Sequence, residues 1–218
     1  MYKEIKTDLR KSPLGLTNDI WLWEDQINDI DFEELNTFLL ELEKELLKKP
    51  PLSTGGTGVN GVTSRFKYYN LLFQKHKELK KVENFINKNI KLFLNYKTID
   101  QKKIYIQCWF NVLREGEEIK SHQHRDISDF HLSFISGNFC TTNNSTKTYY
   151  TSLNGEKGLG IDNYAGKLIL FPSYTPHFTT VNKTKKERIS IAFDIYPDIS
   201  FIDSSYIEGG IIKETVLS

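Results

Sequence analysis

The hydrophobic pattern changes its period near residue 103, and this change constrains the fold more than any other feature. Before it, apolar residues recur at helical spacing: Phe32, Leu35, Phe38, Leu39, Leu42 and Leu46. After it, every second residue is apolar: Ile104, Ile106, Cys108, Phe110 and Val112. The pattern therefore predicts a helical first third followed by a β-rich C-terminal half.

Two helices are expected in the first hundred residues. Asp31 and Glu34 form a capping box ahead of the apolar stripe, and Pro50-Pro51 ends that helix. A second helix is expected near residues 75–95, rich in lysine, which we interpret as a solvated face beside the acidic first helix. The glycine-rich stretch 53–61 predicts a loop that could cover a site.

Many short strands are expected after residue 103. Beyond the strand that begins there, they lie at about 118–125, 130–136, 147–153, 167–172, 177–182 and 188–196. Turn residues separate most of them, including Gly137-Asn138 and the stretch 182–186. We therefore expect one domain over residues 1–218, α+β and mainly β. It would comprise a helical layer over 1–100, a jelly-roll barrel over 103–196 and a C-terminal extension over 197–218.

Composition excludes several classes of protein. The longest apolar run falls short of the roughly 18 residues that a membrane span needs, and the net charge of +1 gives no attraction to nucleic acid or anionic membranes. Two cysteines, Cys108 and Cys140, cannot form a disulfide scaffold. With no signal-like N-terminus, the chain is expected to be cytoplasmic, without membrane or nucleic-acid partners.

Four of the five histidines lie in the β-rich half. His122 and His124 are two apart, so a strand would point both to one face, together with Asp126 if it continues. Alone, His177 is more simply a turn residue. Combined with the His-x-His motif about fifty residues earlier, His177 completes the pattern of non-haem Fe(II) sites. In that pattern one strand provides two metal ligands and a distant strand provides the third.

Arg188 strengthens this interpretation. Strands on either side of residues 182–186 would form a hairpin that brings Arg188 and Ser190 beside His177, facing the same interior. A guanidinium fork suits a carboxylate ligand, and the chain uses only five arginines against 24 lysines. The alternatives are an exposed hairpin arginine beside Glu187, and Lys167 as the interior cation.

These residues resemble the motifs of the Fe(II)- and 2-oxoglutarate-dependent oxygenases. That superfamily has His-x-Asp/Glu, a distal His and an Arg about ten residues later on a double-stranded β-helix, which is a cupin-like jelly roll. The closer resemblance is to the 2-oxoglutarate–Fe(II) oxygenases of marine bacteria and cyanophages, over roughly residues 104–196. It implies Fe(II), 2-oxoglutarate and O2, with 2-oxoglutarate decarboxylated to succinate and CO2 while a C–H bond of an unidentified prime substrate is hydroxylated.

The resemblance leaves two registers for the metal ligands. The spacing Gly116-x-x-Ile119-x-x-His122 favours His122, His124 and His177, which puts a histidine where the superfamily usually has a carboxylate. The other register is His124, Asp126 and His177.

For the co-substrate, the resemblance implies that Arg188, helped by Ser190, binds the distal carboxylate. Asn111, on the strand that enters the site, is expected to form a hydrogen bond with the co-substrate. Related enzymes often place an aromatic hydroxyl near Phe134. Here His131 or Ser133 would replace it, or His131 is a core histidine.

Two other function classes stay open. One is a cupin-like metal-binding protein without oxygenase activity, although no glutamate has the usual spacing of a fourth cupin ligand. The other is a catalytically inactive structural relative, because the first ligand pair has no carboxylate. Neither the prime substrate nor the oligomeric state can be inferred from the sequence.

Overall fold

The computed structural model describes residues 1–5, 20–52, 57–125, 134–152 and 158–217. The strands are β1 (Tyr2–Ile5), β2 (Ile20–Gln26), β3 (Lys103–Leu113), β4 (Ile135–Cys140), β5 (Lys147–Thr151), β6 (Gly158–Asp162), β7 (Lys167–Pro172), β8 (His177–Thr179), β9 (Arg188–Tyr196) and β10 (Lys213–Val216). The α-helices are α1 (Phe32–Leu46), α2 (Lys77–Tyr96) and α3 (Ser204–Glu208). Short 3-10 helices span Val62–Tyr68, Leu71–Phe73 and Ile199–Phe201.

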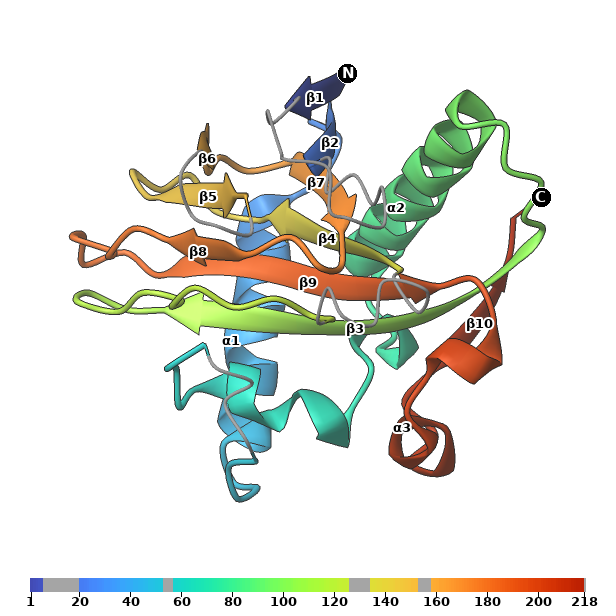
Figure 1. The fold of residues 1–218 in the computed structure, drawn as a ribbon. Coiled ribbons are helices and arrows are strands. Elements are labelled where there is room, and N and C mark those ends of the chain that lie inside the picture. Colours follow the sequence, from blue (N-terminus) through green and yellow to red (C-terminus); the bar gives the residue numbers. More distant parts are fainter. Residues whose placement is uncertain (6–19, 53–56, 126–133, 153–157, 218) are drawn as a thin grey trace.

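The strands form two antiparallel sheets. The larger has the order β1-β2-β7-β4-β9-β3-β10 and the smaller β6-β5-β8. Figure 1 shows α1 and α2 against the large sheet, with β5, β6 and β8 on its other side. The described strands make two sheets and no closed ring, so the mainly β prediction is confirmed while barrel closure is not seen.

Along the two central strands, β9 and β3, side chains alternate between the hydrophobic core on one face and a cavity on the other. On β9, Ile189, Ile191, Phe193 and Ile195 pack in the main core with the helices, while Arg188, Ser190 and Asp194 face a cavity. On β3, Ile104, Ile106, Cys108 and Phe110 are in the core, while Gln107, Trp109 and Asn111 line the cavity. The large sheet therefore has one apolar face under helices and one polar face.

The predicted helices are confirmed. Asp31 caps α1, since its side chain accepts a hydrogen bond of 3.0 Å from the Glu34 backbone N–H. The two oppositely charged helices are neighbours, and Lys77 of α2 makes an ion pair of 2.8 Å with Glu34. The first third is nevertheless not wholly helical, because β1 and β2 extend the large sheet beyond β7.

The strand predictions need three corrections. The strand expected at 118–125 is reduced to an isolated bridge between His122 and His177. The predicted hairpin around residues 182–186 does not form, because β8 pairs with β5 whereas β9 pairs with β3 and β4. β6 and β10 were not expected at all.

A further correction concerns Gly137, which lies inside β4 rather than in a turn. A Cβ atom built on it would lie 2.2 Å from the ring of Phe193, its cross-strand neighbour on β9. This glycine is therefore explained by close packing within a strand.

Candidate functional site

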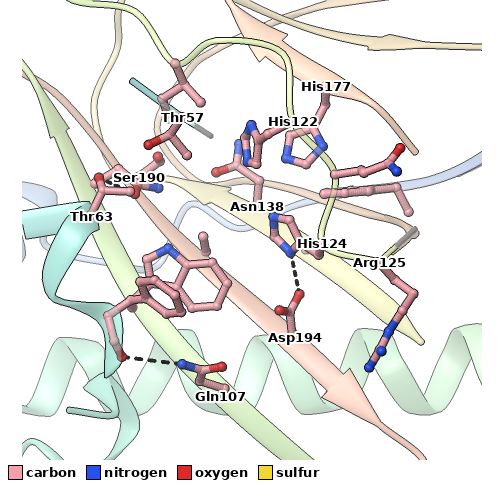
Figure 2. A pocket seen from close by; sticks show the side chains of 18 of the residues that line it. Thr57, Thr63, Gln107, His122, His124, Arg125, Asn138, His177, Ser190 and Asp194 are labelled. Carbon is pink, nitrogen blue, oxygen red and sulfur yellow. Dashed lines mark hydrogen bonds and ion pairs between the residues drawn. The ribbon is translucent and has the colours of Figure 1, made fainter. Parts of the chain in front are cut away.

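A cavity of about 330 Å³ lies over the polar face of the large sheet. Side chains from β3, β4 and β9 line it, together with residues of β5 and β8 in the small sheet and of the connection before β4. Figure 2 shows the cavity from close by, with the three histidines gathered on one side. Its volume is in the range that small-molecule sites occupy.

His122, His124 and His177 form one cluster within this cavity. One candidate ligand atom from each lies within 4.8 Å of the others, and this is the one group of its kind in the described residues. Reciprocal backbone hydrogen bonds of 3.1 and 2.9 Å between His122 and His177 hold those two side by side. The structure thus brings together the three histidines that the favoured register selects.

Each imidazole is held through its Nδ1 atom. Nδ1 of His122 lies 2.9 Å from the Lys120 carbonyl oxygen, and that of His177 lies 3.0 Å from the Thr175 carbonyl oxygen. A carbonyl can only accept, so Nδ1 carries the proton in both rings and the Nε2 lone pair is available to a metal.

Burial, together with the neighbouring histidines, sets the charge of these rings. It lowers the pKa of His122 to about 4 and that of His177 well below its usual range. Both imidazoles are therefore neutral at pH 7, which is the form that binds metals. Three imidazole nitrogen donors without a thiolate suit a divalent ion such as Fe(II).

Arg188 lies in the same cavity with only 2% of its surface exposed. It donates hydrogen bonds of 3.1 Å to Ser190 Oγ and 3.3 Å to Thr148 Oγ1, but its buried Nε has no partner. No described carboxylate forms an ion pair with it, and burial lowers the pKa of its guanidinium. A buried cation with an unsatisfied donor indicates a site for an anion.

Tyr150 adds a second unsatisfied group near Arg188. It follows Thr148 by two residues on β5, is fully buried, and its hydroxyl has no hydrogen-bond partner. Tyr150 and Arg188 are close enough for each to influence the pKa of the other. Lys167, the other cation considered from the sequence, instead makes an ion pair of 3.1 Å with Glu24 and is not among the cavity-lining residues.

The remaining predicted residues have different outcomes. Asn111 is buried in the cavity wall, where its Oδ1 accepts a hydrogen bond of 2.8 Å from Thr63. Asp126, His131 and Ser133 lie outside the described residues, so the alternative ligand register and the proposed hydroxyl substitutes stay predictions.

Sequence reasoning missed Asp194 and Ser136. Asp194 Oδ1 lies 2.6 Å from His124 Nδ1 (Figure 2). The same oxygen accepts a hydrogen bond of 2.7 Å from Ser136 Oγ. The signal for Asp194 was present, because it continues the polar alternation of β9 from Arg188 and Ser190. Ser136 had no comparable signal.

Comparisons with known proteins agree with this geometry. Residues 107–194 match the model of a family described as "Putative 2OG-Fe(II) oxygenase". No curated protein matches the chain. No described helix has the length and apolar character needed to cross a membrane.

Solved structures show which fold this is. A Pseudomonas putida prolyl-4-hydroxylase superposes with a TM-score of 0.53 at 12% identity, over 80% of this chain and 92% of that one. The viral collagen prolyl hydroxylase of Paramecium Bursaria Chlorella virus-1, in complex with 2OG, gives 0.52 at 16%, over 80% and 94%. The α-ketoglutarate-dependent epimerase SnoN of nogalamycin biosynthesis gives 0.51 at 10%, over 83% and 82%.

At these identities the likeness concerns the fold. The family match implies Fe(II), 2-oxoglutarate and O2 as cofactors. The closer likeness to enzymes of marine bacteria and cyanophages stays a prediction. The chain thus has the fold of the 2OG-Fe(II) oxygenases and, over residues 107–194, sequence similarity to that family.

Proposed function

We propose that this protein is an Fe(II)- and 2-oxoglutarate-dependent dioxygenase that hydroxylates an unidentified small or macromolecular substrate. One observation carries the proposal: a cluster of three histidines and a buried arginine with an unsatisfied Nε line the same cavity. A metal ion and a dianion are the ligand pair that this combination would bind.

In this proposal, His122, His124 and His177 hold the metal through Nε2, and their Nδ1 contacts fix the ring orientations. Bound Fe(II), with 2-oxoglutarate and O2, would supply the oxidation that hydroxylates a C–H bond while 2-oxoglutarate becomes succinate and CO2.

The chain's own residues would bind and orient the co-substrate. Arg188 would meet its distal carboxylate, supported by Ser190 and Thr148, which already accept hydrogen bonds from the guanidinium. Tyr150 does not line the cavity itself, but its buried hydroxyl has no partner and lies near Arg188, so we assign it a second hydrogen bond to the same carboxylate. Asn111 retains its amide N–H groups for a further hydrogen bond, since only its oxygen is used by Thr63.

The metal ligands can be tested by anaerobic Fe(II) titration of single variants. His122→Ala, His124→Ala and His177→Ala should each weaken binding severely, whereas Asp126→Ala should have a milder effect. If Asp126→Ala abolishes binding while His122→Ala preserves it, the ligands are His124, Asp126 and His177 instead.

The reaction class is tested by succinate formation from 2-oxoglutarate with Fe(II) and O2. Succinate from the wild type, lost in His177→Ala, supports the dioxygenase. Metal binding without 2-oxoglutarate binding would instead favour a cupin-like binder. Absence of both would favour an inactive relative of the family.

A further inference from the structure

The three histidines differ in what holds their Nδ1 atoms. His122 and His177 contact backbone carbonyl oxygens, whereas His124 contacts the carboxylate of Asp194 at 2.6 Å. Backbone carbonyls orient two of the rings, so orientation alone does not require a charged partner for the third. The carboxylate adds a negative charge behind one ring.

Asp194 is itself an expensive group to bury. It is 6% exposed, and within the described residues no lysine or arginine forms an ion pair with it. Ser136 donates a hydrogen bond of 2.7 Å to the same carboxylate oxygen that His124 contacts. A buried carboxylate without a lysine or arginine partner is stable when a nearby cation compensates its charge. A metal ion on the far side of His124 would be that cation.

Counting charges shows what Asp194 would contribute. A divalent ion with three neutral imidazoles keeps a charge of +2, and the metal-bound carboxylate of 2-oxoglutarate reduces it to +1. With two histidines and one carboxylate as ligands the same sum is zero. We propose that Asp194, acting through His124 as a positioning residue, supplies the negative charge that a carboxylate ligand would otherwise give this metal site. The inference rests on the proposed metal site.

Asp194→Asn separates charge from geometry. The amide is isosteric and keeps an oxygen that can accept from His124 Nδ1, while the Ser136 hydroxyl holds that oxygen in place. Asp203→Asn is the matched control. Asp203 also lines the cavity, but its carboxylate accepts from the Ser205 backbone N–H and asparagine caps equally well there.

The first measurement is Co(II) affinity, without co-substrate. Asp194→Asn should lower it about 10- to 100-fold, the effect expected when the carboxylate behind a ligating histidine is lost. Ser136→Ala should change it by less than about threefold, because the carboxylate and its contact with His124 remain. Asp203→Asn should leave it unchanged.

The second measurement is azide affinity of the Co(II)-loaded proteins, followed by the visible absorption of Co(II). Loss of one negative charge leaves the metal more positive, so Asp194→Asn should bind azide about threefold more tightly or better. A purely structural role would weaken the metal site without raising anion affinity. Opposite changes in the two affinities therefore identify a charge effect.

The outcomes separate the two proposals. If the wild type binds no Co(II), the metal site and this inference both fail. If the wild type binds but Asp194→Asn equals it in both affinities, only this inference fails. Equal losses in Asp194→Asn and Asp203→Asn would also overturn it, because any cavity charge would then have the same effect.

Discussion

Arg188→Ala should nearly abolish binding of 2-oxoglutarate without affecting the metal. The guanidinium is 2% exposed and has no described carboxylate partner, so a bound dianion would be the group that neutralises it. Removing one member of a buried ion pair costs about 3–5 kcal/mol, because the other charge stays buried and unpaired. The dissociation constant should therefore rise by between about two and four orders of magnitude.

The assay is anaerobic calorimetry with metal-loaded protein, preceded by a metal titration. Metal affinity should stay within about threefold of wild type. Arg188→Lys should also be impaired, because a lysine cannot form the two parallel hydrogen bonds of a guanidinium. Lys167→Ala is the matched control, since that cation pairs with Glu24 outside the cavity. Equal 2-oxoglutarate affinity in Arg188→Ala and wild type would refute the assigned role.

A second prediction concerns the effect of Arg188 on the stability of the ligand-free protein. Burial lowers the pKa of Arg188, so the charged side chain destabilises the protein without its ligand. Arg188→Met, of similar length, should therefore leave the melting temperature of the ligand-free protein unchanged or raise it. A large drop in melting temperature would show that Arg188 is a structural residue.

Two further substitutions test the assigned roles of Tyr150 and Gly137. Tyr150→Phe should weaken 2-oxoglutarate binding by at least about tenfold, because a hydrogen bond to a charged group is lost. Calorimetric melting of the ligand-free protein should show no loss of stability, because the substitution removes an unsatisfied buried hydroxyl. Gly137→Ala should destabilise the fold by about 1–3 kcal/mol in urea unfolding, because its Cβ would clash with the Phe193 ring. Gly61→Ala is the control and should be near neutral, because a Cβ built there lies 3.6 Å from its nearest neighbouring atom. Equal losses of stability in Gly137→Ala and Gly61→Ala would contradict this explanation.

The elements that the sequence predicted best are those with a strict local period. α1, α2, β3 and β9 each bury one face against a single core, so the apolar spacing alone locates them. β1, β6 and β10 were missed because four or five residues at a sheet edge have too little burial to leave a pattern. The sequence predicts a turn at Gly137 because close packing and turns both favour glycine.

The sequence predicted those parts of the candidate site whose residue types are rare in this chain. Histidines at short spacing and a rare arginine stand out in a lysine-rich chain. The pairing of His124 with Asp194 could not be found, because 70 residues separate them and only the folded chain brings the connection before β4 beside β9. The hairpin argument for Arg188 was wrong in topology, yet β8 and β9 still line one cavity from opposite sheets.

β2 offers a test of whether the chain is one cooperative domain. Leu22, 1% exposed, packs in a cluster with Tyr150 and Phe171, the latter a residue of the cavity wall. Leu22→Ala should therefore cost about 3–5 kcal/mol and lower the urea midpoint in one transition. Hydrogen exchange of the β9 amides should accelerate by the same free energy. Leu92→Ala, at a 42% exposed position of α2, should have little effect. Unchanged β9 exchange in Leu22→Ala would show that the N-terminal strands unfold separately from the cavity.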